Sequence, residues 1–535
     1  MFKKRSINFV EDLVIFLILF ILYIGLGIYL TQTRDFLPGD AMARMVSSWL
    51  VFQGAEQKLA TIGFVWPPIP TLLVLPLTLL RPLVVSWMAP VIISAASMSL
   101  AGVIINQIAR LCKLARAWRY IFILLFATNP LILSFGANGM SEAVLIAATL
   151  AGFFWLILFW NTDRNTHLIL CGLFMGMLPL IRYEVLLITV AVGLLIFIHS
   201  WSRHSHLGMI DLRNFLEGRL LAYASLVIYP IFLWMLINWQ IMGSPVFFID
   251  NPQSALNIAE TQISSFVDTR FFGAMALGFR LWIEPFPFGI IIALLGLAYG
   301  LWRRSAFLVG LSSLQMITPI FQGLLINQSA TVPLVRYYII NIPLAMITFL
   351  AAYQDFVSTD IAQSKQFPLI KAGALSLLAI IFAASAISSN QTLLTSKFQS
   401  IENPTWVGIS TTQPIPYTHF KQPGEGLKVG RVIPRIVPEG SRILLDTYAG
   451  GYAIILGSGN PKLFLDFTDP NYEDAVLRPW EYADYVLVAS NETEARLSAV
   501  NRAHPDLHSL GASWAILVDE LPATIYDWRL YKIIP

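Results

Sequence analysis

The sequence has few charged residues. Of its 535 residues, 13% are Asp, Glu, Lys or Arg, whereas 56% are hydrophobic. Soluble domains ordinarily carry roughly 25% charged residues. This shortage of charge excludes a purely soluble protein. The net charge of +3 is also not gathered on one face that would bind nucleic acid, because the basic residues lie in short clusters between apolar blocks.

Cysteine is nearly absent, and several common site motifs are missing. The two cysteines are Cys112 and Cys171, so residues 390–535 contain none and their own core must stabilise them. No Gly-Lys-Ser/Thr of a phosphate loop follows the glycines near Gly450 and Gly457. The histidines have no Cys, Asp or Glu companions at metal-site spacing. These motifs therefore do not identify a cofactor.

Long apolar runs dominate the first 390 residues. The run Leu13–Leu30 is long enough to cross a hydrocarbon layer of roughly 30 Å, which takes about 20 helical residues. No small-residue cleavage site follows it, so we interpret it as a retained first span. Hydropathy separates runs at 11–30, 64–82, 86–109, 118–136, 140–160, 166–200, 220–242, 273–301, 306–327, 338–354 and 368–388. This pattern is typical of a polytopic α-helical membrane protein.

Two of these runs need interpretation before the spans can be counted. The run 64–82 has three prolines in its first turns, which lack backbone donors and oppose a helix there, so we expect it to dip into the membrane without crossing. The run 166–200 is too long for one span and is interrupted by Pro179 and by Arg182-Tyr183-Glu184. Charges are costly in lipid, so two short helices that meet at this point are favoured. The prediction is about eleven spans.

Eleven spans with a cytoplasmic N-terminus place every basic cluster on the cytoplasmic side, as the positive-inside rule requires. The clusters are Lys3, Lys4 and Arg5; Arg110, Lys113, Arg116 and Arg119; Arg164; Arg203, Arg213 and Arg219; Arg303 and Arg304; and Lys365 and Lys371. In the alternative, 64–82 crosses and 166–200 crosses once, which misplaces only the cluster from Arg110 to Arg119. Both topologies put the C-terminus outside the cytoplasm.

The composition changes abruptly at Asn390. Prolines and glycines separate short β-type runs, and helix-compatible stretches lie between them, so residues 441–535 are predicted to form an extracytoplasmic α/β domain. Residues 390–440 are predicted to be a loop-rich linker, and residues 1–389 the transmembrane domain. The predicted strands are Arg442–Asp446, Tyr452–Leu456, Lys462–Phe467, Tyr485–Ala489, Trp514–Val518 and Trp528–Ile534.

Asp40 is the first candidate for catalysis. It opens the stretch Gly39–Gly54, whose apolar residues recur at helical spacing and indicate an amphipathic helix on the membrane surface. One interpretation of Asp40 is a helix N-cap. The other is a general base beside the membrane that deprotonates an acceptor hydroxyl.

Glu142 is the second candidate, at the outer mouth of the run 140–160. It is either an interfacial residue favoured by the helix dipole, or it completes a two-carboxylate site with Asp40. Two carboxylates can position an acceptor or bind a divalent metal through oxygen ligands, so metal use stays open.

Arg182 and Glu184 are candidates because ionisable groups at a break between apolar helices often serve function. They either pair with each other, or Arg182 holds a lipid phosphate, whose oxygens a guanidinium matches in bidentate fashion. Arg336, at the outer start of the run 338–354, is either a second phosphate contact or an arginine that extends its charge to the interface.

Four short motifs together resemble the GT-C superfamily of glycosyltransferases that use polyprenyl-phosphate sugars, which includes protein O-mannosyltransferases and aminoarabinose transferases. The motifs are Gly39-Asp40-Ala41, Trp66-Pro67-Pro68, Ser141-Glu142 and Arg182-Tyr183-Glu184, and the resemblance covers roughly residues 1–390. It implies an active site on the outer face, Asp40 as base or acceptor-orienting residue, and a lipid phosphate near Arg182. Trp66 would then contact the donor.

The expected function is transfer of a sugar from a polyprenyl phosphate to an acceptor outside the cytoplasm, with membrane lipids and no nucleic acid as further partners. The alternative is a transporter or lipid flippase, which predicts internal repeats and midplane charges in both halves. Here the candidate charges cluster instead at the outer ends of the first half. A membrane scaffold for the C-terminal domain is a third class, and it leaves Asp40, Glu142 and Arg182 unexplained.

Overall fold

The protein is represented by a computed structural model, which describes residues 2–54, 58–62, 64–250, 254, 270–357, 367–396, 402–415, 423–448, 450–469, 471–492, 495–496, 498–521, 523 and 527–534. Two compact units are present, and each is described by itself. The first unit comprises Met1–Gly25, Ser94–Ala137 and Ser141–Trp406. The second unit comprises Leu26–Ile93, Asn138–Met140 and Val407–Pro535.

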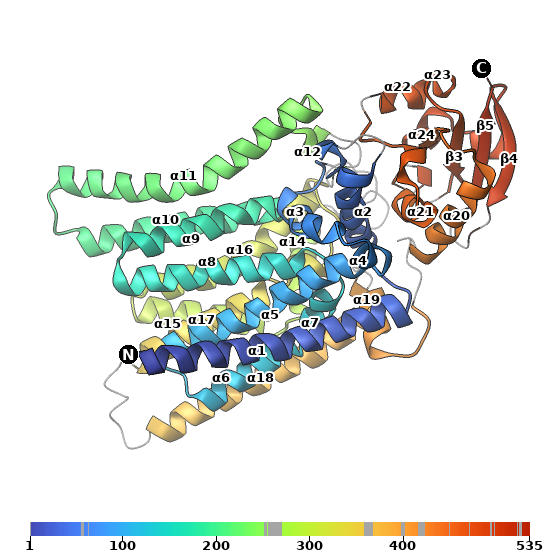
Figure 1. Ribbon diagram of the computed structural model, residues 1–535. Helices are drawn as coiled ribbons and strands as arrows, with labels where there is room; N and C mark the ends of the chain where they lie inside the picture. Colours follow the sequence, from blue (N-terminus) through green and yellow to red (C-terminus); the bar gives the residue numbers. More distant parts are fainter. Residues whose placement is uncertain are drawn as a thin grey trace. The chain divides into compact units, whose positions relative to one another are not determined.

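The first unit is helical, and its helices lie side by side (Figure 1). Some of its helices continue into the second unit. The helices are α1 (Phe2–Ile28), α5 (Met88–Leu111), α6 (Arg116–Ala127), α7 (Pro130–Ala137), α8 (Glu142–Thr162), α9 (Asn165–Met177), α10 (Leu186–His204), α11 (Met209–Met242), α12 (Phe247–Asp250), α14 (Phe271–Ile283), α15 (Gly289–Trp302), α16 (Ala306–Asn327), α17 (Asn341–Val357), α18 (Phe367–Thr395) and α19 (Glu402–Ser410).

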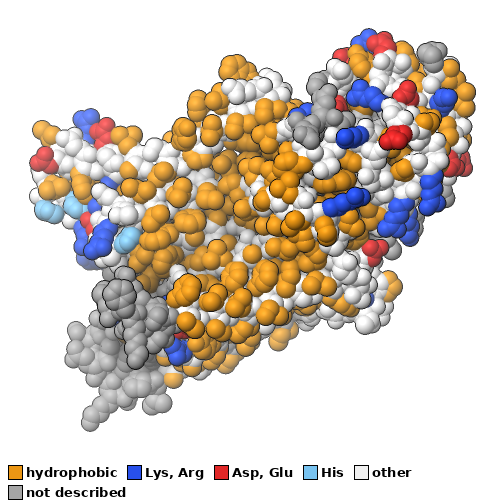
Figure 2. Space-filling model, viewed as in Figure 1, with side chains coloured by type: hydrophobic (Ala, Val, Ile, Leu, Met, Phe, Trp, Pro, Cys, Tyr) orange, Lys and Arg blue, Asp and Glu red, His pale blue; other side chains and the backbone are white. Residues whose placement is uncertain are grey.

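Within the described residues, eight helices are long and apolar enough to cross a membrane, or nine if the bent pair α6 and α7 forms one span. The first unit carries mainly hydrophobic side chains on the face shown in Figure 2. On α1 and α11, for example, Ile18 and Leu221 are each 61% exposed. Lipid tails would cover such side chains. The prediction of a polytopic helical membrane protein is confirmed, with fewer long helices than the eleven spans expected.

The predicted break inside 166–200 is present. Helix α9 ends at Met177, α10 begins at Leu186, and two short 3₁₀ turns, Leu178–Leu180 and Tyr183–Val185, lie between them. Arg182 has an extended backbone between the two turns (φ −155°, ψ 128°). The chain therefore leaves helical geometry at a residue whose charge would be costly inside a continuous apolar helix.

Ion pairs gather at the opposite end of the helices. Helix α8 begins at Glu142 and its 21 residues span about 30 Å before the chain reaches Asp163. Asp163 accepts a hydrogen bond from Arg219 of α11 at 2.7 Å. Figure 2 shows Arg, Lys, Asp, Glu and His side chains gathered where α10 and α11 meet. This end fits the cytoplasmic side that the charge pattern predicts.

We expect reporter proteins fused after Arg116 and after Asn390 to report opposite sides of the membrane. Arg116 starts α6 at an ion-paired end, where its guanidinium lies 3.2 Å from Glu11, whereas Asn390 lies near the end of α18. A phosphatase that is active only outside the cytoplasm, paired with a fluorescent protein that matures only inside, measures the sidedness of each fusion. If both fusions report the same side, the proposed topology is wrong.

The second unit combines short helices with a five-stranded sheet in the order β2-β1-β3-β5-β4. Strand β1 is parallel to both of its neighbours, β2 and β3. Strand β5 is antiparallel to both of its neighbours, β3 and β4. Its elements are α2 (Gly39–Gln53), α3 (Pro68–Thr78), α4 (Arg81–Val85), α20 (Pro423–Ile436), β1 (Ile443–Leu445), α21 (Gly451–Ser458), β2 (Phe464–Leu465), α22 (Tyr472–Leu477), α23 (Pro479–Tyr482), β3 (Tyr485–Ala489), α24 (Ala499–Ala503), α25 (Leu507–Leu510), β4 (Ala515–Leu521) and β5 (Trp528–Ile533).

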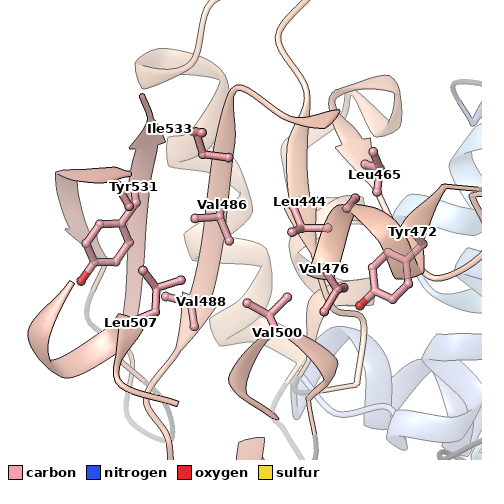
Figure 3. Close-up of a cluster of buried hydrophobic side chains, with 12 residues drawn as sticks. Leu444, Leu465, Tyr472, Val476, Val486, Val488, Val500, Leu507, Tyr531 and Ile533 are labelled. Atoms are coloured by element: carbon pink, nitrogen blue, oxygen red, sulfur yellow. The ribbon is translucent and has the colours of Figure 1, made fainter. Parts of the chain in front are cut away.

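The α/β prediction for the C-terminal region is confirmed, with one strand assigned wrongly. Figure 3 shows its core, in which Leu444, Val486 and Tyr531 from neighbouring strands pack together. Five of the six predicted strands overlap observed strands, but Tyr452–Leu456 lies in helix α21. A short apolar run does not distinguish a buried helix from a strand. The region 390–440, expected to be loop-rich, contains α20 as well as α19 and the end of α18.

Glycines allow α20 and α21 to pack closely. A Cβ atom on Gly457 of α21 would lie 2.5 Å from the backbone oxygen of Leu427 in α20, closer than real Cβ contacts. A Cβ on Gly430 would collide in the same way with the backbone oxygen of Ile454. The α20–α21 pair therefore needs glycine on both helices.

We expect the C-terminal domain to gain stability as the pH falls from 7.5 to 5. Asp466 follows β2 and is 6% exposed. Burial raises its pKa to about 6, although hydrogen bonds from Thr468 oppose the shift. A raised pKa means that the folded state binds the proton more tightly, so ionisation costs stability as the pH rises through 6. The expected gain from Asp466 is about 1 kcal/mol.

The measurement is hydrogen exchange of the β2 amides at both pH values in the full-length protein. Asp466→Asn should remove this contribution, whereas the exposed Asp506→Asn should keep the pH response of the parent protein. An unchanged response in Asp466→Asn would contradict the assignment to Asp466.

Candidate functional site

Arg182 lies between two carboxylates of the first unit. Its Nη1 donates to Oε1 of Glu142 at 2.6 Å, and its Nε donates to Oε1 of Glu184. The side chain of Glu142 is 1% exposed, that of Arg182 13% and that of Glu184 23%. Arg182 is thus fixed by a fully buried partner on α8 and a more accessible partner beside it in the chain.

Arg336 joins the same group from the short turn Val335–Tyr338 before α17. Its Nε lies 3.9 Å from Oε1 of Glu142, and its backbone nitrogen donates to Oε1 of Glu402 at 3.0 Å. The Cζ atoms of Arg182 and Arg336 lie 5.2 Å and 5.7 Å from the centroid of the Tyr337 ring. Both distances are within cation–π range. We call these residues the Arg182 cluster: Glu142, Arg182, Glu184, Arg336, Tyr337 and Glu402.

The cluster places two guanidinium groups around one buried carboxylate. Glu142 Oε1 contacts both arginines, whereas Oε2 is buried and accepts no hydrogen bond within the described residues. A guanidinium has five N–H donors, and Glu142 and Glu184 take one each from Arg182. The arrangement can therefore hold an oxyanion on the arginines and a further hydrogen-bond donor on Glu142.

Asp40 lies in the second unit, as the second residue of α2. Pro38 occupies the N-cap position, two residues before Asp40, so the N-cap interpretation of Asp40 is wrong. Its carboxylate lies in the first helical turn, where the helix dipole stabilises negative charge. Ala41, the next residue, lies close to Gly139, whose φ of +76° favours glycine and where an added Cβ would lie 3.0 Å from Cβ of Pro90 and 3.3 Å from that of Ala41.

Helix α2 does not lie on a surface as its pattern predicted. Residues Ala41–Leu50 are all buried, including Arg44, Ser47 and Ser48. Ser48 Oγ donates to the backbone oxygen of Thr71 in α3 at 3.1 Å, and Ser47 Oγ donates to Tyr452 OH of α21 at 3.2 Å. Polar side chains that would face water in an amphipathic helix are covered here by neighbouring helices.

Trp66 belongs to the second unit with Asp40. It precedes α3, whose first residue is Pro68 and whose 11 residues span about 16 Å, too short to cross the membrane. Pro68 and Pro70 lie in the first turn of α3, where proline is tolerated, and the helix ends at Thr78, two residues after its third proline, Pro76. The guanidinium of Arg44 lies 5.4 Å from the centroid of the Trp66 ring. Arg44 was not predicted to be a site residue. Its position four residues after Asp40 could have indicated it, because opposite charges at this spacing lie on the same face of a helix.

Four of the six predicted site residues therefore lie in one cluster: Glu142, Arg182, Glu184 and Arg336. Asp40 and Trp66 lie in the second unit. Within the described part of the chain, no three His, Cys, Asp or Glu side chains are arranged to hold a metal ion.

Comparison with known proteins gives matches in structure. No protein-family model and no curated protein matches the sequence. The fold is similar to that of ArnT from Cupriavidus metallidurans in the apo state, with a TM-score of 0.56, 11% identity, and coverage of 99% of this chain and 97% of that one. It is also similar to the apo oligosaccharyltransferase of Archaeoglobus fulgidus, with a TM-score of 0.50, 13% identity, and coverage of 95% and 73%.

The chain has the GT-C fold. Both structures share this fold, and the match to ArnT extends over nearly the whole chain, so the C-terminal α/β region is included. The resemblance that the four short motifs indicated is confirmed at the level of the fold. Within this GT-C chain, the Arg182 cluster lies at the break between α9 and α10 and at the start of α8 and α17.

Proposed function

We propose that this GT-C protein is a membrane glycosyltransferase that moves a sugar from a polyprenyl-phosphate-linked donor to an acceptor on the outer face of the membrane. The observation that carries the proposal is the pair Arg182 and Arg336, held around the buried Glu142. Two fixed guanidinium groups at a break between apolar helices suit a phosphate attached to a lipid. The GT-C fold, shared with ArnT and an oligosaccharyltransferase, supports the same class of reaction.

In this proposal the donor phosphate replaces Glu184 as a partner of Arg182. Glu184 is the exchangeable partner because it is 23% exposed, whereas Glu142 is 1% exposed. Arg336, whose Nε lies 3.9 Å from Oε1 of Glu142, supplies a second cation. Glu142 stays in place and fixes both guanidinium groups. Trp66 contributes an aromatic surface to the donor.

Asp40 is the proposed general base. The acceptor oxygen attacks the anomeric carbon while Asp40 takes the acceptor proton, the bond from that carbon to the phosphate oxygen breaks, and polyprenyl phosphate leaves. A direct displacement of this kind inverts the anomeric centre. The arginines stabilise the charge that develops on the leaving phosphate.

We propose that Asp40 and Glu142 both serve the acceptor, with the N-terminus in the cytoplasm and the C-terminal domain outside.

The test is binding of polyprenyl phosphate to the purified protein, compared with the polyprenol of the same chain length. The proposal predicts that affinity depends on the phosphate, because only the phosphate carries oxygens for Arg182 and Arg336. Equal affinity for phosphate and alcohol would show that the protein recognises the lipid tail alone, and the donor assignment would then be wrong.

A further inference from the structure

A groove runs between α10 and α11 near the turn that joins them. Its volume is about 530 Å³ and its lining is almost entirely apolar. Leu212 and Leu216 form its floor and are 5% and 6% exposed, whereas Trp201 and Leu221 on its sides are 47% and 61% exposed. Tryptophan is typical of the level of lipid headgroups. An acyl chain fits these surroundings.

Arg213 and Glu217 of α11 also line the groove, through the apolar parts of their side chains, because almost none of the lining surface is polar. Both are exposed, and they lie one helical turn apart. Oppositely charged residues at this spacing often form an ion pair. The pair is weaker when the cationic residue comes first in the sequence, as Arg213 does here. Within the described residues, neither Arg213 nor Glu217 forms an ion pair, with the other or with any third residue. Both charges are therefore available to a ligand.

The other charges nearby have partners within the protein. Arg219 donates to Asp163 at 2.7 Å and to Ser200 at 3.2 Å. Arg203 lies 3.8 Å from Asp163, and His204 3.3 Å from it. This ion-paired group ties α8, α10 and α11 together beside the groove. Arg213 and Glu217 thus differ from these neighbours in forming no ion pair within the described residues.

The groove is separate from the Arg182 cluster. Helix α8 begins at Glu142 in that cluster and ends before Asp163, which pairs with Arg219 beside the groove. The 21 residues of α8 place about 30 Å between the two ends. A ligand in the groove therefore does not occupy the proposed donor site.

We propose that this groove binds a phospholipid with a zwitterionic primary-amine headgroup, phosphatidylethanolamine. An acyl chain lies on Leu212 and Leu216, the phosphate binds Arg213, and the ammonium binds Glu217. A lipid with an anionic headgroup satisfies Arg213 but meets repulsion from Glu217. Phosphatidylcholine carries the same charges, but its quaternary nitrogen has no N–H to donate to the carboxylate.

The test uses delipidated full-length protein and native mass spectrometry with phosphatidylethanolamine, phosphatidylcholine and phosphatidylglycerol of identical acyl chains. We expect phosphatidylethanolamine to bind about three- to tenfold more tightly than either competitor, the range of one charged hydrogen bond at an exposed site. Glu217→Gln should remove its advantage over phosphatidylcholine. Arg213→Gln should weaken binding of all three lipids.

The matched control is Asp211→Asn, which removes one negative charge from an exposed position of the same helix outside the groove lining. It should bind lipids as the parent protein does. Preference for phosphatidylglycerol, equal binding of the three lipids, or a Glu217→Gln protein that keeps its preference would each overturn the proposal.

Discussion

Asp40→Asn is expected to lower the rate of sugar transfer by about 10²–10⁴-fold, the range typical of a lost general base. The substitution keeps the shape of the side chain but removes its ability to accept the acceptor proton. Helix α2 should persist, because Asp40 does not occupy its N-cap and the helix is buried from Ala41 to Leu50. Affinity for polyprenyl phosphate should change little, since the proposed phosphate contacts are Arg182 and Arg336.

Asp35→Asn provides the matched control for this variant. Asp35 precedes the same helix, is exposed, and has a positive φ of 51°, a conformation that asparagine tolerates. It loses the same charge five positions away and should keep the parental rate. If Asp40→Asn also transfers sugar at the parental rate, Asp40 is not the base, and the role passes to Glu142 or to another residue.

Glu184→Gln is expected to strengthen binding of polyprenyl phosphate, whereas loss of Arg182 should weaken it by about 10- to 100-fold. The first effect follows because Glu184 competes with the phosphate for the Nε donor of Arg182. The second follows because a charge-assisted hydrogen bond is lost. Opposite changes in affinity for polyprenyl phosphate would distinguish a phosphate site from an ion pair that only joins helices. If Arg182 and Glu184 only joined helices, both substitutions would affect the stability of the protein alone.

Arg182→Ala by itself is a poor test of binding. It leaves the buried Glu142 without its nearest cation, and an uncompensated buried charge costs about 3–5 kcal/mol. The double variant Glu142→Gln/Arg182→Gln keeps the charge balanced, and because it also removes the carboxylate beside Arg336, weaker binding in it reports loss of the phosphate site as a whole. Binding is measured with polyprenyl phosphate against polyprenol. Weaker binding in Glu184→Gln would contradict the competition and would make Glu184 a support for Arg182.

The convergence of four charged residues was predictable because charge in a membrane protein is rare and costly. Arg182 and Glu184 interrupt an apolar run, and Glu142 and Arg336 stand where other runs begin. When helices alternate in direction, such positions meet at one end of the bundle. The pairing of Arg182 with both glutamates, and the backbone bond from Arg336 to Glu402, depend on helix packing that one sequence does not specify.

Helix α2 and helix α21 show where sequence patterns are insufficient. The polar residues of α2 predicted a water-facing side, but Ser47 and Ser48 bond to α21 and α3. In α21, apolar residues with β propensity form a helix because glycines let it pack closely against α20. Both outcomes depend on partners distant in sequence. Periodicity detects whether a residue is apolar, not which element covers it.

The most direct test of the central claim is conversion of a lipid-linked sugar by the purified protein. Incubation with membrane lipids of the source organism, followed by mass spectrometry, would detect any polyprenyl-phosphate sugar that is consumed. We predict that the parent protein consumes one such species and releases polyprenyl phosphate, and that Asp40→Asn does not. If no lipid-linked sugar is consumed beyond the Asp40→Asn control, or lipid is moved across vesicles unchanged, the protein is not the glycosyltransferase proposed.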